Sequence, residues 1–298
     1  MLNAILWGVI QGLTEFLPIS SSGHLVLIPA LLGRDGPDLA TSAMLHLGTL
    51  VAVLVYFRTD LARMARFDRA GRRMITIIAI GTIPAVILGL AFESKLDELT
   101  ERPTVVAAML VVTGGILLAT MLLRPGDKTV EEVTPADSIA IGLGQSFALI
   151  PGVSRSGMTI SAGLVRGMAR VDAARFAFLL GIPVIAGAGL LSVARAISDG
   201  SGITAATVVG MVVAAITGYW AIAFLLRVIA KAGLAPFGIY CIAFGAIALV
   251  LLLAASHQSP VARGTATVDL GLGTCDRRMA TSNLRTRCSF SAARPGAR

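Results

Sequence analysis

Charged side chains are scarce in this chain of 298 residues: only 14% are Asp, Glu, Lys or Arg, whereas 55% are hydrophobic. A soluble globular domain has about 25% charged residues, so the composition excludes a soluble protein and indicates an integral membrane protein. The mean hydropathy of +0.82 agrees with this assignment. Aromatic residues are also few, at 5%, so aliphatic residues and glycine must supply most of the apolar surface.

The chain also has few cysteines and no cluster of positive charge in its apolar part, which excludes a cysteine-bound metal cluster and nucleic-acid binding. The chain has three cysteines, and none has the spacing of a metal-binding motif. The net charge is +8, but seven of the 25 basic residues lie beyond residue 255, which leaves 18 basic and 15 acidic groups in residues 1–255. Positive charge is therefore not gathered on one folded face, as binding to nucleic acid would require. We expect no nucleic-acid partner.

Long apolar stretches are plentiful. A helix needs about 20 apolar residues to cross a bilayer, and six stretches are suitable: residues 40–57, 74–92, 104–123, 173–197, 204–229 and 234–255. Two more apolar stretches, 2–31 and 139–164, are interrupted by Pro18 and Pro151. Backbone groups freed at such a break cannot face lipid. We therefore expect an all-α integral membrane protein with six transmembrane helices and two re-entrant helical hairpins.

The two interrupted stretches are copies of one unit at a constant offset of 134 residues. The offset pairs Gln11 with Gln145, Ser20 with Ser154, Ser22 with Ser156, and Gly23 with Gly157. It also places Ser21 opposite Arg155 and His24 opposite Met158, so the two copies carry different reactive groups. Broken helices in an inverted repeat mark a composite binding site near the bilayer midplane.

Basic residues are distributed unequally between the two predicted membrane faces, thirteen against four. The loop 58–73 alone holds six arginines, and the positive-inside rule places it in the cytoplasm. Both termini then lie outside, and the hairpins enter from opposite faces as an inverted repeat. Residues 1–255 form the membrane-embedded domain. Residues 256–298 have no apolar periodicity, and we expect a disordered basic tail.

Glu15 and Arg155 are the only charged residues within the two interrupted stretches, and an ionisable group at membrane depth indicates function. The alternative is a structural ion pair that joins the hairpins. The neighbours of Arg155 are small or polar: Gly152, Ser154, Ser156 and Gly157. A guanidinium fork among hydroxyls and accessible backbone N–H groups is suited to binding phosphate.

The first stretch contributes three hydroxyls and an imidazole, from Ser20, Ser21, Ser22 and His24. Ser20 or Ser22 is expected to cap a helix, and a single histidine in such a place is more often structural than catalytic. Combined with a carboxylate and an arginine, however, these groups can position an anion, activate a nucleophile and protonate a leaving group. His46 is expected either to pack in its span or to make a hydrogen bond at the end of it. Gln11 either braces the break or binds ligand.

QGLTEFLPISSSGH (residues 11–24) and PGVSRSGMTI (151–160) resemble the two signature motifs of the undecaprenyl-diphosphatase family of the bacitracin-resistance type. Residues 224–240 also resemble a late segment of that family, and the resemblance covers about residues 1–255. It implies dephosphorylation of undecaprenyl diphosphate to undecaprenyl phosphate, release of inorganic phosphate, recycling of the cell-wall lipid carrier, and bacitracin resistance. It further implies a divalent cation (Mg²⁺ or Ca²⁺), a homodimer, and a site open to the outer side of the bacterial cytoplasmic membrane.

By motif position, the resemblance carries functional roles to Gln11, Glu15, Ser21, His24 and Arg155. Many family members have a glutamate where this chain has Gln11, so Glu15 is a lone carboxylate and any metal there must also use phosphate oxygens of the substrate. Ser21 is the candidate nucleophile, with His24 or Glu15 taking its proton; attack by a water held by Glu15 and a metal is the alternative. The alternative function is a polyprenyl-phosphate transporter or flippase, which would use the same inverted repeat.

Overall fold

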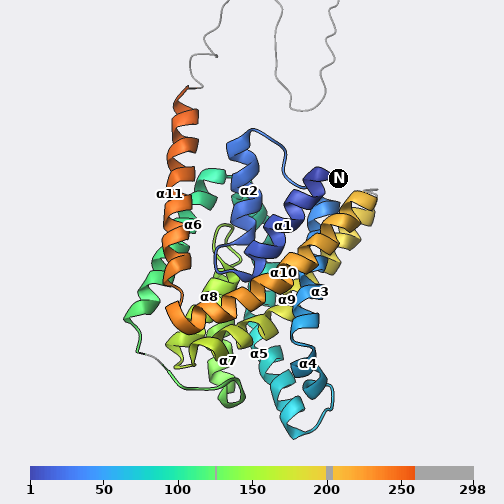
Figure 1. The fold of residues 1–298 in the computed structure, drawn as a ribbon, viewed down its shortest axis with the longest axis vertical. Helices are drawn as coiled ribbons and strands as arrows, with labels where there is room; N and C mark the ends of the chain where they lie inside the picture. Colours follow the sequence, from blue (N-terminus) through green and yellow to red (C-terminus); the bar gives the residue numbers. More distant parts are fainter. Residues whose placement is uncertain (125, 199–203, 259–298) are drawn as a thin grey trace, which may run out of the picture. The chain divides into compact units, whose positions relative to one another are not determined.

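Every regular element is helical in the computed structural model, which describes residues 1–124, 126–198 and 204–258 (Figure 1). Met1–Gln258 forms one compact unit. The helices are α1 (Leu2–Phe16), α2 (Ser21–Leu32), α3 (Leu39–Tyr56), α4 (Arg58–Met64), α5 (Arg69–Thr100), α6 (Pro103–Ala119), α7 (Pro135–Phe147), α8 (Arg155–Val165), α9 (Arg170–Ser198), α10 (Ala205–Ala232) and α11 (Ala235–Gln258), with 3₁₀ turns at Thr120–Leu122 and Val130–Glu132.

Five of the described helices are long and apolar enough to cross a membrane: α5, α6 with its 3₁₀ turn, α9, α10 and α11. Helices α3 and α4, bent by 74° at their junction, form a sixth candidate. These helices cover the six predicted stretches, which confirms the all-helical fold with five or six candidate spans. Helix α11 ends at Gln258, three residues into the predicted tail. The rest of that tail lies outside the described residues.

Helix α5 differs from its prediction in length. It has 32 residues, whereas its predicted apolar stretch covers only 74–92. The added turns at both ends are rich in Arg, Lys, Glu and Leu, which are good helix formers. The apolar stretch therefore marks only the part of the helix suited to lipid, because the helix continues wherever its residues favour helical backbone.

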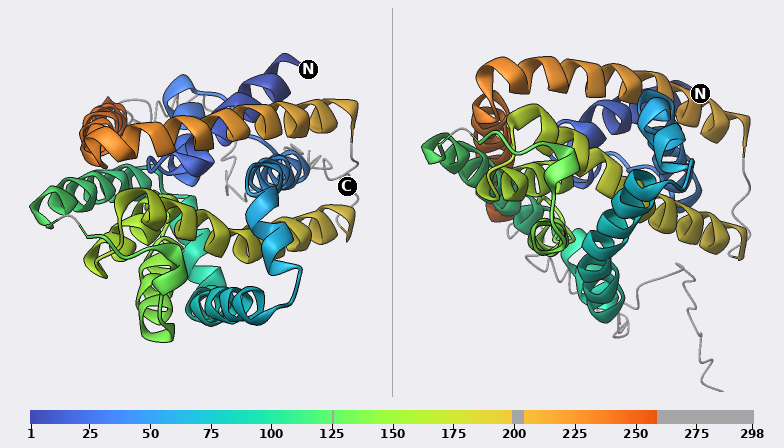
Figure 2. Two further views of the ribbon diagram at one scale, coloured as in Figure 1. Left: turned by 60° about the horizontal axis from the view of Figure 1, so that its bottom comes forward. Right: turned by 90° about the horizontal axis from the view of Figure 1, so that it is seen from below.

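The order of helices repeats across the described unit, not only in the two interrupted stretches. Helices α1, α2, α3, α5 and α6 have counterparts in α7, α8, α9, α10 and α11, which begin 131 to 136 residues later. Equivalent helices make equivalent contacts: α1 packs on α10 and α7 on α5, while α3 packs on α9 and α6 on α11. Figure 2 shows α10 lying along α1. Helix α4 has no counterpart, because α9 continues uninterrupted through the equivalent positions.

Both helical hairpins, α1–α2 and α7–α8, break beside a proline and restart at a capping serine. Ser20 caps α2 by accepting a hydrogen bond from Gly23 N (3.2 Å), and its φ of +68° lies in the left-handed region. Ser154 caps α8 in the same way, from Gly157 N (3.1 Å). A serine oxygen that accepts from the third residue of a helix pairs one of the free N–H groups there. The two helices therefore restart with the same cap, although the backbone differs, because φ is +68° at Ser20 and −79° at Ser154.

The tips of the two hairpins touch one another. Ser156 Oγ donates to Leu17 O (3.1 Å), and Ser20 Oγ donates to Val153 O (3.4 Å). Thr113 of α6 holds the second tip, because its Oγ1 donates to Gly152 O (3.2 Å). In Figure 1, α1 and α2 lie above this meeting point and α7 and α8 lie below it. The two breaks are therefore brought together, as the repeat predicts.

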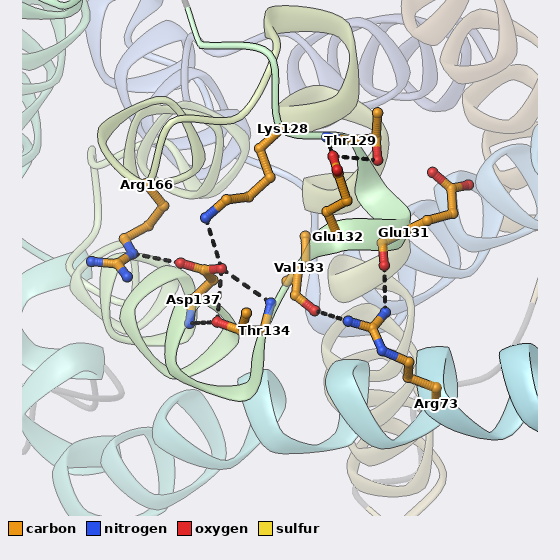
Figure 3. Close-up of polar contacts among 9 residues, drawn as sticks. All are labelled: Arg73, Lys128, Thr129, Glu131, Glu132, Val133, Thr134, Asp137 and Arg166. Atoms are coloured by element: carbon orange, nitrogen blue, oxygen red, sulfur yellow. Dashed lines mark hydrogen bonds and ion pairs between the residues drawn. The ribbon is translucent and has the colours of Figure 1, made fainter.

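The base of the second hairpin is fixed by Asp137, in the first turn of α7 (Figure 3). Its carboxylate accepts from Arg166 Nε (2.7 Å), Lys128 Nζ (2.9 Å) and Thr134 N (3.0 Å). Burial raises the pKa of the Asp137 carboxyl, but these hydrogen bonds outweigh burial and hold the pKa below its usual range. The ionised carboxylate therefore ties the start of α7 to the end of α8, and so holds the hairpin that carries Arg155.

Candidate active site

A cavity of 160 Å³ lies where the two hairpin tips meet α3 and α9. Its polar lining comes from three places: Thr14, Glu15, Ser21 and Ser22 of the first hairpin, Ser154 and Arg155 of the second, and His46 of α3. Apolar side chains of α9 close one wall. Pockets for drug-sized ligands measure about 300–1,000 Å³, so this cavity is of a size for a polar head group and not for a lipid chain.

Glu15 is the centre of the hydrogen-bond network at the cavity. Its Oε1 pairs with Arg155 Nη2 at 3.0 Å, and its Oε2 accepts from Ser21 Oγ at 2.6 Å and from Gln11 Nε2 at 3.0 Å. The Glu15 side chain is buried, so the carboxylate depends on these donors. A hydroxyl in short contact with a carboxylate is the arrangement of a nucleophile with its base. The two hairpins thus each supply one part of a single charged pair.

The two terminal guanidinium nitrogens of Arg155 differ in their hydrogen bonding. Nη2 contacts Glu15, whereas Nη1 is buried and has no hydrogen-bond partner among the described residues. A buried charged donor without an acceptor is costly, and an anionic oxygen would satisfy it. Gly181 of α9 provides the space for this nitrogen, because a Cβ at Gly181 would lie 1.9 Å from Nη1. Arg155 thus lines the cavity with one guanidinium nitrogen that no acceptor among the described residues pairs.

Five sequence-predicted site residues line the cavity: Glu15, Ser21, Ser22, Ser154 and Arg155. Three others lie outside the cavity lining and support it through hydrogen bonds. Gln11 bonds to Glu15, and Ser20 and Ser156 join the hairpin tips. The expectation that the backbone of Gly152 and Gly157 binds ligand needs correction at Gly157, because Gly157 N donates to the Ser154 cap. At Gly152, which packs on Val106 O of α6, it stays a prediction. These glycines shape the tip, since a Cβ at Gly152 would lie 2.3 Å from that carbonyl oxygen.

The structure does not bring His24 into the cavity. Its ring is buried against α11, where it stacks on Phe244 with 4.9 Å between ring centroids. Nδ1 is 2.8 Å from Ser20 O and Nε2 is 2.7 Å from Tyr240 Oη. Because a carbonyl only accepts, Nδ1 carries the proton and Nε2 accepts from the Tyr240 hydroxyl. Both nitrogens are therefore engaged away from Ser21, which leaves Glu15 as the base in contact with that hydroxyl.

His46 makes a hydrogen bond within α3, from Nδ1 to Ser42 O at 2.8 Å, which is one of the two roles expected for it, but its side chain also lines the cavity, which was not expected from the sequence. It belongs to neither signature motif, so the motifs could not reveal it. A usable signal was nevertheless present, because an ionisable residue within an apolar span indicates function by the same rule that selected Glu15 and Arg155. The structure supplies the missing information, namely which imidazole faces those two residues.

The described residues contain no group of three or more His, Cys, Asp and Glu side chains that would hold a metal ion. Glu15 is the single carboxylate in the cavity lining, and Arg155, Ser21 and Gln11 already occupy its two oxygens. Mg²⁺ and Ca²⁺ need about six or more oxygen ligands. The side chains of this site therefore do not fit a resident divalent cation on their own.

Comparisons with known proteins agree with the sequence motifs. The family model described as bacitracin resistance protein BacA matches residues 4–247. The undecaprenyl-diphosphatase of Pelobacter propionicus is 42% identical over 267 residues, which cover 85% of this chain and 97% of that protein. Those of Rubrobacter xylanophilus and Nocardioides sp. are 41% and 40% identical, and the matches cover 98% and 96% of those proteins. With a family model matching most of its length and relatives this similar, the chain belongs to the bacitracin resistance protein BacA family.

Proposed function

We propose that this protein removes the terminal phosphate of undecaprenyl diphosphate, giving undecaprenyl phosphate and inorganic phosphate. The reaction would recycle the lipid carrier of cell-wall synthesis and confer bacitracin resistance. The supporting observation is the contact of one carboxylate, Glu15, with both a hydroxyl, Ser21, and a guanidinium, Arg155, at one cavity. A nucleophile, its base and an anion-binding cation are the groups that phosphoryl transfer requires.

In the proposed mechanism, Ser21 Oγ gives its proton to Glu15 and attacks the terminal phosphorus. The bond from that phosphorus to the bridging oxygen breaks, and undecaprenyl phosphate leaves with the bridging oxygen. Water then attacks the phosphoserine and the bond from phosphorus to Ser21 Oγ breaks. The proton held by Glu15 returns to Ser21 Oγ, and inorganic phosphate leaves with both protons of the water. Arg155 would bind a phosphate oxygen through Nη1 while Nη2 stays on Glu15, and its charge would stabilise the transition state.

We infer that the polyprenyl chain lies in a groove of 410 Å³ between α5 and α7. The groove is lined mostly by apolar side chains, among them Phe147, Leu149 and Ile150. Ala148, within that same segment, lines the polar cavity, so groove and cavity adjoin. The groove also follows the second half of α5, from Leu88 to Leu99, which ends at the predicted outer face. This position suits a substrate that arrives from the outer leaflet.

A divalent cation remains a prediction for this protein. Since Glu15 alone does not form a cation site, we propose that Mg²⁺ or Ca²⁺ enters as a counter-ion of the diphosphate and contacts Glu15 only there. Under this proposal the apparent metal affinity follows the substrate concentration. Chelator titrations at two substrate concentrations test it: midpoints that do not move would instead indicate a resident metal site.

In the cytoplasmic membrane, we propose, the six candidate spans cross the bilayer while α1–α2 and α7–α8 enter as re-entrant hairpins of an inverted repeat. The repeated helix order and the meeting of the hairpin tips support this arrangement. The cavity would open to the outer side. The homodimer implied by the family resemblance remains a prediction.

A thiol-labelling experiment tests this orientation. Asp97 and Arg66 are both exposed and lie at opposite ends of the α5 region. In a background with Cys275→Ser and Cys288→Ser, where Cys241 is buried, a membrane-impermeant reagent on intact cells should label Asp97→Cys and not Arg66→Cys. Lysed cells should label both, which controls for accessibility. Labelling of Arg66→Cys alone on intact cells would invert the proposed topology.

The enzymatic assignment is tested with purified protein in detergent and undecaprenyl diphosphate. We expect stoichiometric release of phosphate, and no release from Glu15→Gln. A lipid transporter would use the same repeated helix order, so the alternative is tested in liposomes. Movement of the lipid diphosphate between leaflets without phosphate release would support the transporter and contradict the phosphatase.

Gly181→Ala should lower turnover by about 10-fold to 10²-fold, because its new methyl group would displace the Arg155 guanidinium that binds the anion. Folding should be little affected, since only the flexible end of one side chain must move. Gly187→Ala on the same helix is the matched control, because a Cβ there meets no atom within 4 Å. Phosphate release and thermal unfolding are measured for both. Equal turnover in the two variants would show that Gly181 does not position Arg155.

A further inference from the structure

His46 lines the polar cavity and uses only one of its two ring nitrogens in a hydrogen bond within the described residues. Its Nδ1 lies 2.8 Å from Ser42 O, one turn earlier on α3. Because a carbonyl oxygen only accepts, Nδ1 must carry a proton. Nε2 has no hydrogen-bond partner in the part of the chain that the structure describes, and the half-buried side chain lines the cavity with Glu15 and Arg155. The ring is thus oriented by one nitrogen and leaves the other available.

The turn of α3 that carries His46 is closely packed, which fixes its backbone and Cβ, while the hydrogen bond to Ser42 O orients the ring. Gly189 of α9 approaches this turn of α3, where a Cβ would lie 3.1 Å from Leu47 Cδ2 and 3.9 Å from His46 Cβ. Thr49 Oγ1 donates to His46 O at 2.9 Å. Side chains held on rigid elements preserve the geometry that a reaction requires. His46 therefore has the fixed placement expected of a group that contacts a ligand.

The charged residues at the cavity do not by themselves balance the charge of a lipid diphosphate, so its binding requires a further hydrogen-bond donor. Glu15 and Arg155 carry opposite unit charges and pair with each other, so they cancel. A lipid diphosphate brings several negative charges, and a site for phosphoryl transfer must stabilise them with fixed cations or hydrogen-bond donors. Apart from these two residues, His46 is the only ionisable side chain among the described residues that line the cavity.

We propose that His46 is a further catalytic residue, whose Nε2 donates a hydrogen bond to a phosphate oxygen of the bound diphosphate. This inference rests on the proposed function and extends its anion-binding site to a third element, α3. When Nε2 is protonated, the ring donates from both nitrogens, to Ser42 O and to the phosphate. His24 is not equivalent, because both of its nitrogens are engaged by Ser20 and Tyr240.

Two substitutions separate this role from a structural one. His46→Gln places an amide nitrogen near the former Nε2 and loses the nitrogen that bonds Ser42 O. His46→Asn does the opposite, since its amide nitrogen replaces Nδ1 and nothing reaches the cavity. We expect Asn to lower turnover by about 10-fold to 10²-fold, as for loss of one preorganised donor, and Gln to be about 10-fold more active than Asn. Leu54→Ala, an exposed position on the same helix, is the control.

The assay measures phosphate release from undecaprenyl diphosphate and inhibition by pyrophosphate in folded protein. A higher inhibition constant for Asn than for Gln supports the contact. Wild-type values for Asn, while Arg155→Lys is impaired in the same preparation, would overturn the inference and leave the proposed function intact. Asn more active than Gln would also overturn it, because the bond to Ser42 O would then be what matters. If wild-type protein released no phosphate, the proposed function would fail, and stabilisation by pyrophosphate would still compare the two variants.

Discussion

Arg155→Lys is expected to reduce turnover by about 10²-fold or more, in the range seen when one preorganised charge donor is removed. The guanidinium uses its two terminal nitrogens differently: Nη2 contacts Glu15 at 3.0 Å, while Nη1 is buried without a partner among the described residues. A lysine has a single nitrogen and cannot hold Glu15 and a phosphate in this fixed geometry. The loss should therefore occur although the charge is retained.

The measurement is the turnover of purified Arg155→Lys with undecaprenyl diphosphate, compared with Arg175→Lys. Arg175 is also paired with a carboxylate, at 2.9 Å from Asp60, but it lies outside the cavity lining. That control shows what an arginine-to-lysine change costs at an ion pair without a ligand. Near-normal turnover in well-folded Arg155→Lys would contradict the assignment of Arg155 to the phosphate.

Ser21→Ala should reduce turnover on the order of 10³-fold or more if Ser21 is the nucleophile, since removing a nucleophile removes the covalent pathway. The 2.6 Å contact from Ser21 Oγ to Glu15 Oε2 is the structural basis for this expectation. Ser20→Ala is the comparison, because Ser20 caps α2. Loss of a cap costs about 1 kcal/mol of stability, so turnover should fall far less.

A second measurement separates serine attack from water attack. Rapid quench after reaction with ³²P-labelled substrate should leave ³²P on wild-type protein and none on Ser21→Ala. If water held by Glu15 attacks instead, Ser21→Ala keeps substantial turnover, no label appears on the protein, and Glu15→Gln is inactive. Robust turnover without label would exclude the serine mechanism and leave Ser21 as a donor to the phosphate.

The sequence by itself determined that the helices lie in lipid, where the two hairpins break, and which two charged residues lie within them. Few charges and long apolar stretches can only be satisfied in lipid, so the helical membrane fold follows from composition. Pro18 and Pro151, each shortly before a capping serine, are local signals that act through their neighbours in the chain. Glu15 and Arg155 were recognisable because a charge inside an apolar stretch is unusual wherever the chain folds.

The tertiary structure alone decided which imidazole lies at the cavity. His24 contacts Tyr240, 216 residues later in the chain, and His46 reaches the cavity only because α3 crosses α9 beside the hairpin tips. The role of Gly181 likewise depends on the end of Arg155 lying against α9. Such contacts join residues far apart in sequence, and no local pattern records them. A side chain's neighbours, and so which of its atoms remain free for chemistry, are set by how the helices pack.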